Sequence, residues 1–347
     1  RDWRKQQDPE NLIDYRRLYR YIWMVYGLGL LVFGALQLLR YIFYSPQDFG
    51  KAAEEGLSTG LALVLVGLPV FWKTWQIIQT SLTSSDDQRS SLRLSVLFIL
   101  TFLGIGFSLG ALGILLANGF RWLLAVDTRT LSVFIDQNAN PLAVGITLGV
   151  VWLYFRQKLN QTIQQQEGPF QKAHLQRVYH TILAFAGLVV TFLGLMVLLG
   201  FMIETVFNQS LGKNSATLSD AFAFLLVGTP LWLNHWRKIQ FETSSDNELG
   251  AEARKSLTRK IYLYLALFAT VVGSMLSTGW WIYGILKALL DQMPANFWLS
   301  FFMQLRLAVL FSVLLMYHLR VLRSDGRAIW QPKSIAETQY SVVVVYA

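Results

Sequence analysis

The 347-residue chain contains no cysteine, which excludes disulfides, thiolate metal sites and cysteine nucleophiles. Charge is also scarce, because only 15% of the residues are charged while 54% are hydrophobic. The mean hydropathy is +0.40. Since a typical soluble domain carries about 25% charged residues, this composition excludes an ordinary soluble domain. A lipid bilayer is therefore the expected solvent for most of the chain.

Catalytic motifs are missing as well. The sequence has no phosphate-cradling loop, no dinucleotide-binding glycine fingerprint, no His-Glu-x-x-His and no serine elbow. The paired carboxylates Glu54-Glu55 and Asp86-Asp87 fall in short polar loops, and no carboxylate lies in the middle of an apolar run. A proton pump or coupled carrier would bury several carboxylates along a path. We therefore expect a protein that is not an enzyme, and active transport is disfavoured.

Long apolar runs dominate what is present. Crossing about 30 Å of hydrocarbon takes about 20 helical residues, and eight segments are long enough. They are residues 18–44, 57–79, 91–118, 139–157, 176–207, 217–237, 259–290 and 296–322. A β-barrel would instead need short alternating stretches. The sequence predicts an all-α integral membrane protein with eight transmembrane helices.

The positions of the basic residues predict the orientation. Most of the 30 Lys and Arg residues fall in the N-terminal segment, the loops after even-numbered spans, and the C-terminal segment. The opposite side holds only Arg40, Lys51, Arg121, Arg129, Lys213 and Lys287. Because Lys and Arg favour cytoplasmic loops, both termini are predicted to be cytoplasmic. The basic rim is expected to attract anionic lipid headgroups, so the net charge of +9 requires no nucleic-acid partner.

An internal repeat with an offset of about 160 positions divides the chain into two halves. Arg17-Leu18-Tyr19 matches Arg177-Val178-Tyr179, and the Gly-x-Pro of Pro69 matches that of Pro230. We predict four pseudo-repeated helical hairpins in two homologous four-span halves. The predicted segments are a cytoplasmic N-terminal segment 1–16, a first half 17–160, a linker 161–175, a second half 176–323 and a cytoplasmic tail 324–347.

The polar segments between the spans are short. Residues 161–168 are rich in glutamine and are interpreted as a polar linker or a helix extension. The polar stretch from Arg1 to Arg17 predicts that no cleavable signal peptide opens the chain. In the tail, residues 341–346 favour an extended conformation, so the tail either is disordered or pairs with another protein.

Small residues and prolines mark places where the helices deviate from regular packing. Gly106 and Gly110, like Gly145 and Gly149, are four positions apart, which favours close helix packing inside the molecule over a dedicated oligomer interface. Pro69 and Pro230 are expected to kink the second and sixth spans. Matched breaks can mark a central binding site. Here both halves begin on the same side, which weakens that interpretation.

Arg306 is the one basic residue placed deep inside a predicted span. The matching positions in the other hairpins hold alanine, at 62, 143 and 223. Glu204 and Asp220 are the candidate partners at similar depth. Arg306 either forms a structural ion pair or binds an anionic headgroup, a carboxylate or a quinone-like ligand, because a charge within the membrane is often functional.

His235 and His318 occupy the same repeat position in the sixth and eighth spans, where Thr74 and Tyr154 stand in the others. Two facing imidazoles could ligate a haem, and one could ligate a pigment magnesium. Both histidines lie near basic and aromatic residues at the cytoplasmic ends of their spans. That neighbourhood favours an interfacial belt over a ligand site, and no cofactor is strongly implied.

Several motifs resemble a family of repeated bacterial membrane domains that is catalogued as a domain of unknown function and is frequent in Chloroflexi-type bacteria. They are residues 16–21, 66–72, 227–236 and 317–325. Residues 150–155 depart most, since they lack the proline and the histidine. The resemblance implies a membrane architecture and a bacterial origin, and it supplies no reaction.

These observations favour a scaffold or accessory subunit of a larger complex in a bacterial cytoplasmic membrane, with lipids and other proteins as its partners. One alternative is a transporter or channel with a path between the two halves, near Pro69, Pro230 and Arg306. The other is a haem-, pigment- or quinone-binding redox subunit that uses His235, His318 or Arg306. The sequence leaves these alternatives open.

Overall fold

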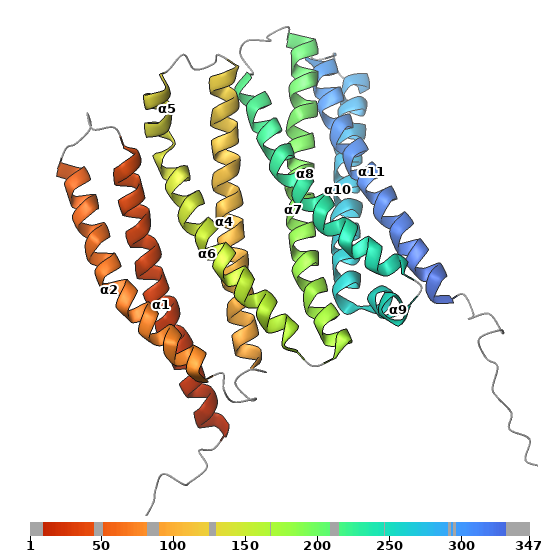
Figure 1. The fold of residues 1–347 in the computed structure, drawn as a ribbon. Helices are drawn as coiled ribbons and strands as arrows, with labels where there is room; N and C mark the ends of the chain where they lie inside the picture. The colour runs from red at the N-terminus through yellow and green to blue at the C-terminus, as the bar shows by residue number, and fades with distance from the viewer. Residues whose placement is uncertain are drawn as a thin grey trace, which may run out of the picture.

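A computed structural model describes residues 10–44, 51–81, 90–124, 130–166, 168–208, 215–245, 247–290, 293 and 296–330. Within these ranges the regular structure is entirely helical (Figure 1). The long helices are α1 (Glu10–Phe43), α2 (Lys51–Ser81), α4 (Ser91–Leu123), α6 (Ala139–Gln164), α7 (Pro169–Asn208), α8 (Ser215–Ser244), α10 (Leu257–Leu290) and α11 (Phe297–Trp330). Two short helices, α5 (Leu131–Gln137) and α9 (Glu248–Lys255), lie between them.

Eight helices in the described part of the chain are long and apolar enough to cross a membrane. They coincide with the eight predicted spans, and the prediction of eight apolar helices is confirmed. In no span is more than 33% of the most apolar window buried inside the molecule. In every span, most residues of that window are therefore not fully buried by the rest of the molecule.

The segments between spans contain more helix than the sequence analysis expected. Helix α9 lies in a stretch interpreted as a loop, although Asn247 caps it by accepting a hydrogen bond from the Gly250 N–H at 2.8 Å. Most of the predicted linker 161–175 is helical, because α6 extends to Gln164 and α7 begins at Pro169. The predicted extended tail at 341–346 lies outside the described residues.

The helices form four hairpins that stand in a row. Each long helix packs against its neighbour in the chain, giving the pairs α1–α2, α4–α6, α7–α8 and α10–α11. The second helix of each later pair also packs against the first helix of the preceding pair, so that α6 contacts α1, α8 contacts α4 and α11 contacts α7. Figure 1 shows the pairs side by side, from α1–α2 at one end to α10–α11 at the other.

Glycines bring the two backbones of a hairpin together. A Cβ atom on Gly27 of α1 would lie 2.7 Å from the Phe71 nitrogen of α2. Gly187 of α7 meets the Trp232 nitrogen of α8 in the same way. Gly106 and Gly110, which were expected to serve this purpose, do not, because a Cβ on either would meet nothing within 4 Å. Gly145 and Gly149, the other predicted pair, do face α4, since a Cβ on them would meet the side chains of Ala111 at 3.6 Å and Ser108 at 3.4 Å. The contacts with backbone are made at glycines that the four-residue spacing did not identify.

The matched prolines sit inside continuous helices, Pro69 in α2 and Pro230 in α8. Each proline lies two residues after a glycine that packs closely against the other helix of its hairpin. A Cβ on Gly67 would lie 2.7 Å from the Leu31 nitrogen, and one on Gly228 would lie 2.6 Å from the Thr191 nitrogen. The Gly-x-Pro sequence is thus a packing contact in both hairpins, and a kink at the prolines stays a prediction.

We expect Gly27→Ala to lower the thermal stability of the purified protein, because the new methyl group would meet backbone, which cannot move away as a side-chain tip could. Overpacking of this kind costs about 1–3 kcal/mol. Gly29→Ala is the matched control, since a Cβ two residues along the same helix meets nothing within 4 Å. Melting curves in detergent that are equal for the two variants would contradict the contact.

Candidate functional site

Arg306 of α11 lies against the backbone of α7. Its Nη1 donates a hydrogen bond to the carbonyl oxygen of Met196 at 2.9 Å. Gly200 leaves the space for this guanidinium, because a Cβ there would collide with Nη1. Glu204, one turn further along α7, supplies a negative charge that acts on Arg306. This arrangement ties α11 to α7, and Asp220, the other predicted partner, lies elsewhere.

Asp220 of α8 pairs with Arg121 of α4, whose Nη2 lies 2.5 Å from Oδ1 of the carboxylate. Arg121 Nη1 also donates to Asn118 Oδ1 at 3.0 Å, and Asn118 Nδ2 donates to Asn138 Oδ1 at 2.8 Å. A chain of polar contacts thus runs from α8 across α4 to the start of α6. The pairing of Asp220 with Arg121 was not predicted, because the two charges come from different halves and no local sequence pattern connects them.

A cavity of about 490 Å³ lies next to Asp220, between α4, α7 and α8. Its volume is within the range of about 300–1,000 Å³ that is usual for ligand pockets. It is lined by Gly106, Leu109, Gly110, Gly113, Ile114, Ala117, Ala186, Val190, Asp220, Ala223, Phe224, Val227 and Leu231. Among these Asp220 alone is charged. The glycines of α4 therefore create space between the two halves instead of closing it.

The histidines are arranged differently from the sequence expectation. His235 of α8 pairs with His180 of α7, with the two Nδ1 atoms 2.8 Å apart. His318 of α11 is fully buried. Its Nδ1 donates to the Leu314 carbonyl oxygen at 2.9 Å, and its Nε2 faces the Tyr262 hydroxyl at 3.4 Å. His235 and His318 therefore have separate partners, although they share a repeat position.

The close His180–His235 contact is a hydrogen bond in which one ring donates and the other accepts. Two nitrogen ligands at about 2.0–2.1 Å from a tetrahedral metal would stand roughly 3.3 Å apart. At 2.8 Å the two Nδ1 atoms leave no room for an ion between them. Within the described residues no group of three or more His, Cys, Asp or Glu side chains could hold a metal ion.

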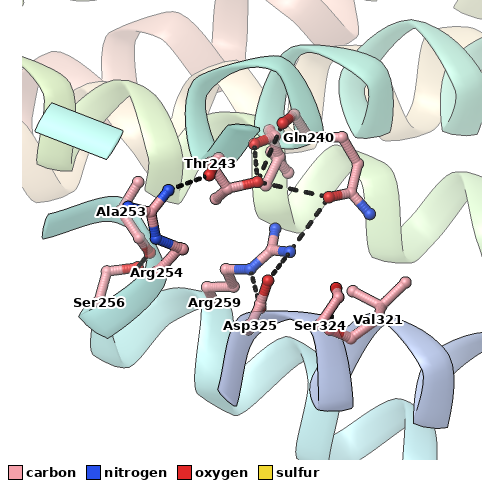
Figure 2. A network of polar contacts seen from close by, with 10 residues as sticks. Gln240, Thr243, Ala253, Arg254, Ser256, Arg259, Val321, Ser324 and Asp325 are labelled. Atoms are coloured by element: carbon pink, nitrogen blue, oxygen red, sulfur yellow. Dashed lines mark hydrogen bonds and ion pairs between the residues drawn. The ribbon is translucent and has the colours of Figure 1, made fainter. Parts of the chain in front are cut away.

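A buried network of polar contacts connects three helices of the second half at its predicted cytoplasmic end (Figure 2). Arg259 of α10 donates from Nε to Asp325 Oδ2 at 2.6 Å and from Nη2 to Asp325 Oδ1 at 3.0 Å. Nη2 also donates to Gln240 Oε1 of α8 at 3.1 Å. The guanidinium lies 5.6 Å from the Trp236 ring. Because this paired geometry is a strong form of charge-assisted bond, the network ties α8, α10 and α11 together.

Two neighbouring arginines, Arg254 and Arg177, make further polar contacts in the same region. Arg254 Nη1 donates to the Thr243 carbonyl oxygen at the end of α8 at 2.5 Å, where helix carbonyls lack partners. Arg177 Nε donates to Glu242 Oε1 at 2.8 Å. The sequence predicts a basic rim at the cytoplasmic side that includes these arginines, yet Arg177 and Arg259 are buried. Arg93, Arg177 and Arg259 each stand at the start of an odd-numbered span. This shared position is the sequence signal that could have marked them as structural residues.

Asp325→Ala should strongly destabilise the second half, because Arg259 and Asp325 are only 3% and 9% exposed and the change leaves a buried guanidinium without its carboxylate. Breaking a buried pair in this way costs about 3–5 kcal/mol. The double variant Arg259→Met, Asp325→Leu removes both charges and should melt closer to the wild type. If the double variant were the less stable of the two, the network would not be a charge pair. Arg320→Ala, which changes an exposed arginine of α11, is the control.

The comparisons with known proteins give a family. The sequence model of the family described as a domain of unknown function (DUF5671) matches residues 17–154 and again residues 177–317. These two segments make up most of the chain, which therefore belongs to that family and contains its domain twice. The first match runs from α1 into α6 and the second from α7 into α11. No curated protein and no solved structure matches the chain.

Proposed function

We propose that this protein is a non-enzymatic scaffold or accessory subunit of a larger assembly in a bacterial cytoplasmic membrane, with both termini on the cytoplasmic side. The observation that carries the proposal is the packing rule of the hairpins. Among the described helices it is obeyed three times, whereas α2 and α10, at the two ends of the described row, lack the corresponding contact. Each end therefore presents a helix surface of a kind that is covered elsewhere in the same molecule.

The first free end is α2. Among the described helices it packs extensively against α1 alone, and its Trp75 also meets the rings of Tyr154 and Phe155 of α6. The matched alanines show the consequence. Ala143 of α6 and Ala223 of α8 are 0% and 4% exposed, whereas Ala62 of α2 is exposed. A position that is covered in the second and third hairpins is therefore open in the first.

The other free end is α10, the first helix of the last hairpin. Its counterpart α7 receives α11, with Phe192 against Phe311 and Arg306 on Met196. Among the described helices, α10 packs extensively only against its hairpin partner α11. Its side chains Met275, Ile282 and Leu286 are exposed.

We assign the two free ends to each other, so that α2 of one copy packs against α10 of the next. By the packing rule, α10 is the helix that would receive a following hairpin. Helix α2 shares the Gly-x-Pro sequence of α8, which packs against α4. Within lipid, helices associate through close packing and not through the hydrophobic effect, so a matched shape favours a specific partner. Head-to-tail contacts of this kind build rings or rows.

The alternatives receive less support from the geometry. A transporter needs a polar path between the halves, yet the cavity found there is apolar apart from Asp220. A haem held by the two matched histidines would need His235 and His318 to face one ligand, whereas His235 pairs with His180 and His318 is engaged by Leu314 and Tyr262. The proposed assembly would cover the exposed helix surfaces at both ends of the row.

Cysteine cross-linking tests the head-to-tail contact cleanly, because the natural chain has no cysteine. A variant with both Ala62→Cys and Ile282→Cys should form cross-linked dimers and longer species in native membranes under mild oxidation. The control pairs Ala62→Cys with Val150→Cys, which lies on an exposed surface of α6 in the middle of the row. If the two variants cross-link equally, the cross-links arise from random collisions and the proposed contact between α2 and α10 is wrong.

Native mass spectrometry after gentle extraction supplies an independent measurement. We expect masses of two or more chains in the wild type. Ala62→Trp should shift them toward single chains, because a bulky ring would block the free face of α2. A wild-type protein that is monomeric at all protein concentrations would overturn the proposed assembly.

A further inference from the structure

The cavity between the two halves has the length of one lipid leaflet. It extends along α4 from Ala117 to Gly106 and along α8 from Asp220 to Leu231. Eleven residues of helix rise by about 16 Å, which is about half of the 30 Å hydrocarbon core. Asp220 lies five residues after the start of α8 at Ser215, so the cavity begins near the headgroup level and ends near the middle of the membrane.

The walls of the cavity fit an apolar chain. Gly106, Gly110 and Gly113 form one side, and a Cβ on any of them would meet nothing within 4 Å. An apolar void forfeits the dispersion contacts of the atoms that line it. In a bilayer, acyl chains are the apolar material at hand, and they lie parallel to the long axis of this cavity.

The mouth of the cavity carries one positive and one negative group side by side. The side chains of Arg121 and Asp220 are 36% and 38% exposed, so a headgroup can reach both of them. A guanidinium has five N–H donors, and the described contacts of Arg121 use one on Asn118 and one on Asp220. Arg121 therefore keeps donors that Asp220 does not use.

A zwitterionic headgroup complements this pair better than an anionic one does. Its phosphate can accept charge-assisted hydrogen bonds from the Arg121 guanidinium, and its ammonium can donate to the Asp220 carboxylate. An anionic headgroup without an ammonium would place its phosphate next to the negative charge of Asp220. The charges at the mouth thus select for a lipid that carries both signs.

We propose that the cavity holds one acyl chain of a phosphatidylethanolamine-type phospholipid. The lipid comes from the leaflet at which α4 ends and α8 begins. Its phosphate lies on Arg121 and its ammonium on Asp220. The lipid fills the gap between the two family domains and joins them. This site is independent of the free ends of the row, since α2 and α10 contribute nothing to it.

Native mass spectrometry of the full-length, delipidated protein tests this assignment. Dioleoyl phosphatidylethanolamine should be retained at one molecule per chain, and dioleoyl phosphatidylglycerol should bind about tenfold more weakly, because one charge-assisted contact is exchanged for repulsion. Soluble phosphoethanolamine should not bind, since it has no acyl chain. Equal retention of the two diacyl lipids would overturn the role of the Arg121–Asp220 pair.

Variants separate the chain from the headgroup. Gly110→Leu fills the cavity and should reduce retention of phosphatidylethanolamine at least tenfold, whereas Gly29→Leu adds the same side chain at an open position on α1 and should not. Asp220→Asn should abolish the preference over phosphatidylglycerol while both lipids still bind.

Unchanged retention in Gly110→Leu would place the lipid elsewhere. If that variant does not fold, Gly113→Ala adds a single methyl group to the same wall and should weaken retention relative to Gly29→Ala. The comparison of the two lipids on the wild-type protein decides the headgroup question without any variant. The cross-linking between Ala62→Cys and Ile282→Cys is measured separately, so failure of the lipid site and failure of the assembly can be told apart.

Discussion

Close contact between helix backbones within the first three hairpins is the constraint on which the rest of the structure depends. Lipid tails are as apolar as the side chains, so the hydrophobic effect cannot hold one span against the next. Short contacts at Gly27 and Gly187 replace it, because the missing side chain lets a neighbouring backbone approach. Once each hairpin is a rigid unit, its second helix can pack against the hairpin before it. The row of hairpins follows from repeating that step.

The row explains why space and polar groups gather where they do. Between α4, α7 and α8 the two family domains meet with small residues, and a cavity of about 490 Å³ remains. At the predicted cytoplasmic end, Arg259 and Asp325 are buried together and lock three helices. At the opposite end, Arg121 and Asp220 keep a third or more of their side-chain surface exposed. The buried pair serves the fold, and the exposed pair is available to a ligand.

A great part of the fold is predictable from the sequence, and much less of the site is. The eight helices follow from the length of apolar runs, since a backbone in lipid must satisfy its own hydrogen bonds. The duplication follows from an offset of about 160 positions, and two matches to one family agree with it. Helix α9 was not predicted, because the polar residues around it favour a loop, although Asn247 is a favoured N-cap residue.

The sequence by itself determined the number of long apolar helices and the duplication of the domain. Only the tertiary structure decided that His235 meets His180, that Asp220 meets Arg121 and that Arg306 rests on the Met196 carbonyl. Periodicity reports which residues share a helix face, but the partner of that face depends on the rotation and tilt of a second helix. Those angles are set by backbone contacts at a few glycines, and the spacing of glycines along one helix does not reveal which of them touch a neighbour.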